Sequence, residues 1–190
     1  MKPSHQIRTL FDENQIARRN QEMAQAIVAA SSPDLLVVAV LKGSFMFAAD
    51  LIRALHRVDA APQVEFIHLS SYGTGTVSSG QVTVLRDIES EVVGRDVLLV
   101  DDILESGRTL SFAKDLLMAR GARRVLVAVL LEKKSRRAVQ IEADFVGFTC
   151  PDMFVVGYGM DVAHSFRQLP FVGVVAHGAA EPDLFDDRTR

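Results

Sequence analysis

The sequence predicts an α/β domain in which a parallel central sheet is flanked by helices. Short continuous apolar runs alternate with segments of helical length over most of the 190 residues. These runs lack a polar alternation, which is typical of strands buried on both faces of a parallel sheet. A content of 48% hydrophobic and 24% charged residues is that of an ordinary globular protein, large enough to bury a core without disulfides or a structural metal.

The first third of the chain predicts a helix, a strand and a second helix. Residues 12–30 place Met23 and Ile27 on one helical face, behind an Asp- and Asn-containing start that suits a helix cap. Residues 34–41 form an apolar run of strand length. A second helical segment over 45–58 follows almost directly, after a Lys-Gly-Ser sequence.

The same alternation continues along the chain. Strands are predicted over 64–70, 82–88, 96–100 and 124–131, and a helix over 108–121. Residues 71–81 are almost all Ser, Thr and Gly, and they are too numerous for a tight hairpin turn. We expect one domain over 1–190, because no internal repeat or linker interrupts the pattern, with an acidic tail from about residue 177.

Charge and composition exclude several classes of partner. The formal net charge of −3 provides no global basic field for a nucleic acid or an anionic membrane, so neither is an expected partner. The single Cys forms no zinc-binding pattern and no internal disulfide, and no apolar stretch has the length of a membrane-spanning helix. We expect a cytoplasmic protein.

The clearest functional segment is VLLVDDILESGRTL, residues 97–110. Asp101 and Asp102 follow an apolar strand, at the edge of a parallel sheet where ligands bind. The next predicted helix is preceded by small and polar residues, namely Glu105, Ser106, Gly107, Arg108 and Thr109. Free N–H groups at a helix start bind phosphate, and paired carboxylates suit ribose hydroxyls or a divalent cation. The segment therefore predicts a sugar phosphate site.

Three other interpretations of this segment explain its residues less well. Acids that merely cap the next helix explain any single residue but not three acids beside Ser-Gly-x-Thr. A P-loop NTPase requires a G-x-x-x-x-G-K-[ST] motif, which this chain lacks. A phosphorylation-receiver domain would carry its acid pair near its start and an acceptor Asp at the end of a later strand, whereas Asp144 precedes FVGF.

Segment 97–110 resembles the phosphoribosyl-diphosphate signature of the type I phosphoribosyltransferases. Further segments are similar to motifs of the hypoxanthine-guanine branch of that family, in the same order: VLKGSFMFAADL (40–51), SSYG (70–73), LLEKKSRR (130–137) and PDMFVVGYGMD with FRQL (151–169). The resemblance covers about residues 35–170. It implies a small hood subdomain built from the chain ends beside the central sheet.

The resemblance implies transfer of a 5-phosphoribosyl group from phosphoribosyl diphosphate to N9 of a 6-oxopurine, with release of diphosphate. Such a reaction passes through an oxocarbenium-like state, and the site must stabilise charge of both signs. By resemblance, Asp101 and Asp102 hold the ribose hydroxyls directly or through Mg²⁺, which Asp161 also binds. Residues 105–109 wrap the 5′-phosphate.

The remaining roles are likewise implied by the resemblance. Lys42 and Gly43 bind diphosphate, in a loop that commonly has a cis peptide between the residues matching Leu41 and Lys42, and Arg167 reaches the same group. The purine is bound by Lys133, Phe154 and Val155, which supply a donor to the 6-oxo group, a stacking ring and a backbone contact. Ser71 and Tyr72 belong to a lid that excludes water.

Single residues have plainer interpretations. Taken alone, Phe154 is expected in the core, and Lys133 and Arg167 are expected to be solvated. Cys150 is expected to be a buried, unreactive thiol, and His164 has no expected catalytic role.

The sequence departs from the resembled family at two positions. The family usually has Glu-Asp where this chain has Asp101-Asp102, so the pair supports the superfamily better than the branch. Glu105 stands where an Asp is thought to accept the N7 proton of the purine. A carboxylate is retained with one more methylene, and its role as the base is a hypothesis that depends on reach.

Several points stay open from the sequence. An alternative function is a regulator on the same fold that senses phosphoribosyl diphosphate and binds nucleic acid, although no basic extension is evident. The sequence does not rank hypoxanthine, guanine and xanthine as substrates, and the family resemblance implies a homodimer or homotetramer.

Despite the net charge of −3, cations can gather locally around a sugar diphosphate: Lys42, Arg108, Lys133, Arg137 and Arg167.

Overall fold

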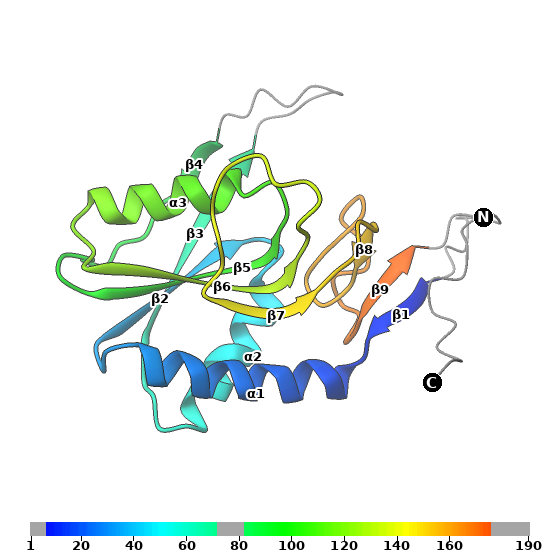
Figure 1. Ribbon diagram of the computed structural model, residues 1–190, viewed down its shortest axis with the longest axis horizontal. Coiled ribbons are helices and arrows are strands. Elements are labelled where there is room, and N and C mark those ends of the chain that lie inside the picture. The colour runs from blue at the N-terminus through cyan, green and yellow to red at the C-terminus, as the bar shows by residue number, and fades with distance from the viewer. Residues whose placement is uncertain (1–6, 72–81, 176–190) are drawn as a thin grey trace.

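The computed structural model describes residues 7–71 and 82–175 (Figure 1). Along this part of the chain the elements are β1 (Ile7–Phe11), α1 (Glu13–Ala30), β2 (Leu35–Leu41), α2 (Phe45–His56), β3 (Gln63–Ser71), β4 (Val82–Arg86), β5 (Asp96–Leu104), α3 (Arg108–Ala119), β6 (Arg124–Glu132), β7 (Phe145–Thr149), β8 (Val155–Val156) and β9 (Val172–Val175). The predicted helices and strands are all present, with small differences at their ends. The acidic tail lies outside the described residues.

The central sheet has the strand order β4-β3-β2-β5-β6-β7. The pairs β3–β2, β2–β5, β5–β6 and β6–β7 are parallel, which confirms the predicted parallel core. The edge strand β4 pairs with β3 in the antiparallel direction. An antiparallel neighbour needs no helical crossover, so the polar segment between β3 and β4 can connect them directly.

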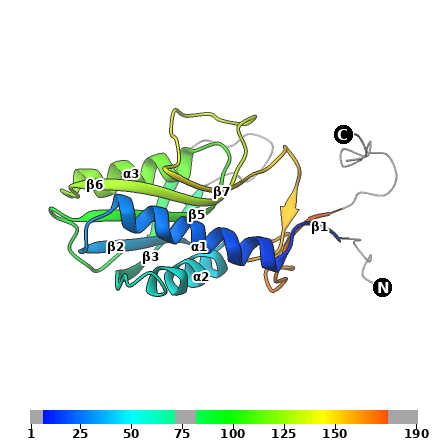
Figure 2. The ribbon, with the colours of Figure 1, turned by 60° about the horizontal axis from the view of Figure 1, so that its bottom comes forward.

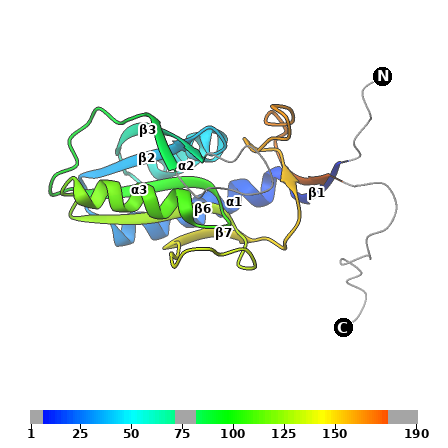
Figure 3. The same ribbon diagram turned by 90° about the horizontal axis from the view of Figure 1, so that it is seen from above.

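Helices cover both faces of this sheet. Figure 2 shows α1 and α2 side by side on one face, and Figure 3 shows α3 on the other. Alternate residues of β2 enter different cores, because Val37 and Ala39 pack with α1 and α2 whereas Leu36 and Val38 pack with α3. Both faces of the strand are therefore buried, which explains the uninterrupted apolar run.

A second sheet has the order β1-β9-β8 and is antiparallel. Its strands come from both ends of the described chain, and it lies at the end of the molecule beyond α1 and β7 (Figure 1). We call it the hood sheet. Over the described residues, no helix is both long enough and apolar enough to cross a membrane.

The start of α1 confirms the predicted cap. The Asp12 side chain accepts a hydrogen bond from the Gln15 N–H, and the Gln15 side chain accepts one from the Asp12 N–H, each at 2.8 Å. This reciprocal pair satisfies two N–H groups at the helix start. It fixes where α1 begins after the hood strand β1.

Asp96 joins three elements at the amino end of the central sheet. Its buried carboxylate accepts hydrogen bonds from Arg123 (2.9 Å), Arg124 (2.7 Å) and the Ser32 N–H (3.0 Å). Burial alone would raise the pKa of Asp96, but the hydrogen bonds from Arg124 and Arg123 outweigh it and lower the pKa to about 2. The end of α1 and the starts of β5 and β6 are thereby tied together.

Asp96→Asn should lower the free energy of unfolding by about 2 kcal/mol at pH 7. The folded pKa lies below the unfolded value of 3.8, so the stabilisation is complete above about pH 4 and disappears as the pH falls through about 2. The difference between wild type and variant should therefore be smaller at pH 3 than at pH 7. Urea unfolding followed by circular dichroism at both pH values measures it.

Asp34→Asn is the matched control for this prediction. The Asp34 side chain is 76% exposed and pairs with Arg95 at 3.1 Å, so its loss should change the free energy of unfolding by less than about 1 kcal/mol. Equal losses in the two variants would show that Asp96 does not hold these elements together.

Candidate functional site

Two adjoining cavities open at the carboxyl ends of the parallel strands. The large cavity has a volume of about 820 Å³ and the small cavity about 340 Å³. They share a wall formed by Leu41, Gly43, Leu69, Asp102, Ile103 and Glu105. These residues come from the ends of β2, β3 and β5, which is the edge where the sequence placed the site.

Asp101 and Asp102 lie within β5 and not after it. The ladder between β5 and β6 continues to the pair Leu104–Glu132, so the prediction that this strand ends at residue 100 is wrong. Polar side chains do not interrupt the pairing of the main chain, and a hydrophobic pattern alone misses such an extension. Asp102 lines both cavities, and Asp101 lines the small one.

The carboxyl pair is electrostatically unfavourable as it stands. Asp101 is 8% exposed, and its Oδ1 accepts a hydrogen bond from the Asp102 N–H at 2.9 Å. Burial raises the pKa of Asp101 well above its usual range, and the neighbouring charge of Asp102 raises it further. Burial also raises the pKa of Asp102. Ligand hydroxyls or a cation at this wall would favour the charged forms.

The loop after β2 approaches Asp102 closely. A Cβ atom at Gly43 would lie 1.7 Å from Oδ2 of Asp102, so a side chain at that position would force the Asp102 carboxylate to move. The Leu41–Lys42 peptide bond is cis, as the resemblance implied. Lys42 lines the large cavity and Gly43 lines both, so this loop and the acid pair form one continuous surface.

The start of α3 faces the small cavity. Ser106, Gly107 and Thr109 line it, and Gly107 precedes the helix with a left-handed φ of 81°. The N–H groups of a helix start and the helix dipole together attract an anion. Arg108 is not among the residues that line either cavity, although the sequence placed it in the phosphate site.

Glu105 lies between two cations at the other end of the shared wall. Its Oε1 is 3.7 Å from Nζ of Lys133 and 3.7 Å from Nε of Arg136. Lys133 is only 5% exposed, and its N–H donates to the Leu104 carbonyl at 2.9 Å. The plain expectation of a solvated Lys133 is therefore wrong, because the end of β6 holds it inside the large cavity.

Phe154 and Val155 line the large cavity from the segment that leads into the hood sheet. Phe154 is 53% exposed, so the plain expectation that it belongs to the core is wrong. An exposed ring at the wall of a cavity offers a flat apolar face to a planar ligand. Val155 is buried at the start of β8, where it pairs with Val174.

Arg167 and Asp161 form an ion pair at the wall of the large cavity, with an N–O distance of 2.6 Å. Arg167 also donates to the Gly159 carbonyl at 2.6 Å. Asp161 accepts a hydrogen bond from the His164 N–H at 2.7 Å. The plain expectation of a solvated Arg167 is incorrect, because its guanidinium is held by these two acceptors.

Other predicted residues lie elsewhere. Ser71 is the last residue of β3 and pairs with Val82, and Tyr72 lies outside the described residues. Arg137 does not line either cavity. It pairs with Glu132 at 3.0 Å and donates to the Glu105 carbonyl at 3.4 Å, so it supports the site from behind.

Sequence reasoning missed several residues of the large cavity. Arg136 and Asp152 pair at 2.8 Å beside Glu105, and His68 and His164 also contribute to the wall. Arg136 and Asp152 lie in segments that the resemblance had singled out, so their neighbourhood was visible but their contact was not. His68 follows the apolar part of β3 and carried no motif.

The phosphoribosyl transferase domain family matches residues 6–163. The hypoxanthine-guanine phosphoribosyltransferase of Bacillus subtilis is 41% identical over 169 residues, which cover 88% of this chain and 92% of that protein. A crystal structure of a hypoxanthine-guanine phosphoribosyltransferase from Bacillus anthracis is 41% identical, with a TM-score of 0.84, and the match covers 90% of this chain and 100% of that chain.

A longer relative is also similar. The bifunctional protein TilS/HprT of Listeria innocua is 41% identical over 181 residues, which cover 95% of this chain and 27% of that protein. The chain therefore spans about a quarter of the length of this bifunctional relative and nearly all of the Bacillus proteins.

Asp101→Asn should raise the free energy of unfolding at pH 7, on the order of 1 kcal/mol, because it removes an unfavourable buried charge. The pKa of Asp101 is higher in the folded than in the unfolded chain, so its charge destabilises the fold once the pH rises above the unfolded pKa. The gain should shrink at pH 3. Urea unfolding in the presence of a chelator measures it, since a bound cation would mask the effect.

Asp115→Asn, at an exposed position of α3, is the control and should leave stability nearly unchanged. If Asp101→Asn were no more stable than wild type at pH 7, the charge at this position would be compensated within the folded chain.

Proposed function

This chain belongs to the phosphoribosyl transferase domain family, and we propose that it transfers the 5-phosphoribosyl group of phosphoribosyl diphosphate to N9 of hypoxanthine or guanine. The products are IMP or GMP and diphosphate, as in purine salvage. The observation that carries the proposal is the wall shared by the two cavities. There the carboxyl pair of β5 lies between a helix start suited to phosphate and a pocket with a buried lysine and an exposed ring.

The small cavity suits the 5′-phosphate and the ribose. N–H groups at the start of α3, with the hydroxyls of Ser106 and Thr109, are hydrogen-bond donors to phosphate oxygens. Asp101 and Asp102 are acceptors for the 2′- and 3′-hydroxyls of the ribose. Residues 106–109 are proposed to bind the 5′-phosphate. Arg108 contributes only through its main chain at the helix start, because its side chain does not line the cavity.

The large cavity suits a 6-oxopurine. The Lys133 ammonium carries only donors, so it pairs with a 6-oxo group and not with the 6-amino group of adenine. Phe154 offers a face for stacking, and the main chain of Val155 meets the edge of the ring. A buried donor without an acceptor would make adenine a poor substrate.

Diphosphate would lie between the loop after β2 and Arg167. Lys42, the Gly43 main chain and Arg167 supply donors and positive charge along one side of the large cavity. Ser71 and Tyr72 are proposed to belong to a lid that excludes water from the reacting carbon. Water that reached this carbon would otherwise hydrolyse phosphoribosyl diphosphate without forming a nucleotide.

In the transfer, the bond from C1′ to the diphosphate oxygen breaks as the bond from C1′ to N9 forms. Positive charge develops on the ribose and negative charge on the leaving diphosphate. Asp101 and Asp102 lie on the ribose side, and Lys42 and Arg167 lie on the diphosphate side. The site therefore holds each sign of charge where its opposite develops.

Glu105 is proposed to accept the proton that the purine loses from N7. Its carboxylate lies 3.7 Å from Lys133, so it is placed beside the group that would bind the 6-oxo oxygen of the same ring. The N7 atom and the 6-oxo oxygen lie on the same edge of a purine. The longer side chain of Glu therefore still brings a carboxylate to the edge where a base is needed.

Magnesium fits the residues at the shared wall. Asp101 and Asp102 supply hard oxygen ligands in a place where burial raises the pKa of both, and the Arg167 charge offsets this only in part for Asp102. Asp161 is directly paired with Arg167 at 2.6 Å. Among the described residues, no three acids, histidines or cysteines gather into a complete metal site, so substrate oxygens would complete the ligand set. When bound, Mg²⁺ neutralises the diphosphate oxygens.

The proposal extends to a cytoplasmic homodimer or homotetramer, which the family resemblance and the composition support. Its partners are phosphoribosyl diphosphate and a purine base, without nucleic acid or membrane. The same site in a regulator that senses phosphoribosyl diphosphate would bind the substrate without turning it over.

Incubation with phosphoribosyl diphosphate, Mg²⁺ and single purines tests the function. Nucleotide should form from hypoxanthine or guanine, and adenine should react at least about a thousandfold more slowly, because it gives Lys133 no acceptor. Chromatography of the nucleotide and a diphosphate assay measure it. Binding of phosphoribosyl diphosphate with no product from hypoxanthine or guanine would favour the regulator, and product from adenine alone would place the chain in another branch.

Glu105→Gln should lower kcat about a hundredfold or more, with little change in the KM for either substrate, because the amide cannot accept the N7 proton. Glu105→Asp is the matched control and should keep most of the activity, since it retains a carboxylate. Steady-state kinetics of nucleotide formation measures both. Near-normal turnover of Glu105→Gln with unchanged KM values would remove Glu105 from the role of base.

A further inference from the structure

Tyr158 lies in a tight turn beside the large cavity but is not part of its wall. The N–H of Gly157 donates to the Met160 carbonyl at 3.0 Å, and the N–H of Met160 donates back at 3.1 Å. Both central residues have positive φ values, 49° for Tyr158 and 100° for Gly159, as turns of this narrow type require. A non-glycine residue is uncommon in this conformation, although Ala163, His164 and Phe166 of the same segment share it.

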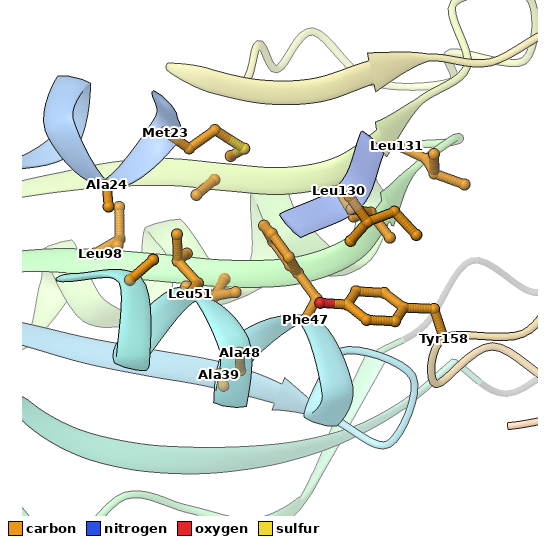
Figure 4. Packing of buried hydrophobic residues seen from close by; sticks show 14 of the residues in the cluster. Met23, Ala24, Ala39, Phe47, Ala48, Leu51, Leu98, Leu130, Leu131 and Tyr158 are labelled. Atoms are coloured by element: carbon orange, nitrogen blue, oxygen red, sulfur yellow. The ribbon is translucent and has the colours of Figure 1, made fainter. Parts of the chain in front are cut away.

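The Tyr158 side chain reaches from this turn into the main core. It is 6% exposed and points toward Phe47 of α2 (Figure 4). Its hydroxyl donates to Oδ2 of Asp50 on α2 at 2.7 Å and accepts a hydrogen bond from Nδ2 of Asn20 on α1 at 3.0 Å. One phenol thus connects the turn to both helices on that face of the sheet. Burial, then the Asp50 bond, raises the pKa of Tyr158 far above its usual range, so the hydroxyl keeps its proton.

The next residue, Gly159, contacts both groups assigned to diphosphate. A Cβ at Gly159 would lie 2.1 Å from the Gly43 carbonyl oxygen, so the turn rests directly on the loop after β2. Gly159 also exchanges two hydrogen bonds with Arg167, through its N–H at 3.0 Å and its carbonyl at 2.6 Å. The position of the turn therefore determines where Gly43 and Arg167 lie relative to each other.

We propose that Tyr158 is a positioning residue for the diphosphate half of the site. Its hydroxyl, fixed by Asp50 and Asn20, holds Gly159 against the Gly43 carbonyl and keeps Arg167 in the wall that Lys42 also lines. The inference rests on the proposed function, because it assigns diphosphate to these groups.

The purine half has separate supports. Lys133 directly follows β6, and its main-chain N–H donates to the carbonyl of Leu104 at the end of β5. Val155 is held by pairing with Val174 in the hood sheet. Neither support passes through the Tyr158 hydroxyl. Loss of that hydroxyl should therefore weaken the binding of diphosphate and leave the contacts to the purine in place.

Tyr158→Phe removes the hydroxyl and keeps the ring. We expect the KM for phosphoribosyl diphosphate and the Kd for inorganic diphosphate with Mg²⁺ to rise on the order of tenfold, as for the loss of one or two hydrogen bonds. The KM for hypoxanthine should change less than about twofold. Steady-state kinetics and calorimetry measure these values.

Two changes at Asp50 test the hydrogen bond itself. Asp50→Ala removes the acceptor and should reproduce the shift, whereas Asp50→Asn keeps an acceptor oxygen and should behave like wild type. The double variant Tyr158→Phe/Asp50→Ala should be no worse than either single variant, because the two changes break one connection. Since Asp50 is partly exposed, these variants keep the test open if Tyr158→Phe folds poorly.

Ile27→Val, which trims the same core cluster far from the turn, is the control for lost stability. It should leave the Kd for diphosphate unchanged. An unchanged Kd in Tyr158→Phe, or an equal rise in Ile27→Val, would overturn the inference. Wild-type protein that makes no nucleotide but binds diphosphate would contradict the proposed function alone, and the Kd series would still decide the role of Tyr158.

Discussion

The site depends on the close approach of the loop after β2, the Asp102 side chain and the turn at Gly159. On one side the Asp102 carboxylate lies where a Cβ of residue 43 would be, and on the other side Gly159 lies against the Gly43 carbonyl. These contacts bring the ends of β2 and β5 together with the turn that precedes Arg167. The wall between the two cavities follows from this packing, because Gly43 and Asp102 line both. A side chain at 159 would push against the Gly43 main chain, and a side chain at 43 would displace the Asp102 carboxylate.

The two ends of β5 show how environment decides the role of one residue type. At the amino end, Asp96 is buried with two guanidinium groups and an N–H, and its pKa is lowered to about 2. At the carboxyl end, Asp101 is buried and Asp102 partly buried without a guanidinium hydrogen bond comparable to those of Asp96, and their pKa values are raised. The first arrangement stabilises the fold. The second leaves two carboxyl groups without the hydrogen bonds and opposite charge that a bound ligand would supply. Stability and binding are thus separated along one strand.

The sequence patterns predicted the architecture more accurately than they predicted the surroundings of single side chains. The alternation of apolar runs and helical segments located the strands and helices, because burial of the backbone imposes that periodicity. Average tendencies of single residues, taken alone, predict Phe154 in the core and Lys133 in solvent, and the structure reverses both. A binding cavity exposes apolar surface and buries charge, so average tendencies fail where a ligand is expected. Arg137 was likewise expected beside the sugar diphosphate, whereas its side chain forms an ion pair with Glu132 behind the site.

The fold class, the acid pair and the order of the motifs follow from the amino-acid sequence alone, since these depend on local periodicity and on residues adjacent in the chain. The sequence also indicates that Glu105 offers a carboxylate of unusual length. The folded structure was needed to see how far β5 extends, that Glu105 lies between Lys133 and Arg136, and that Tyr158 joins the turn to α1 and α2. These contacts join residues distant in the chain, and only the packing of the elements sets such distances.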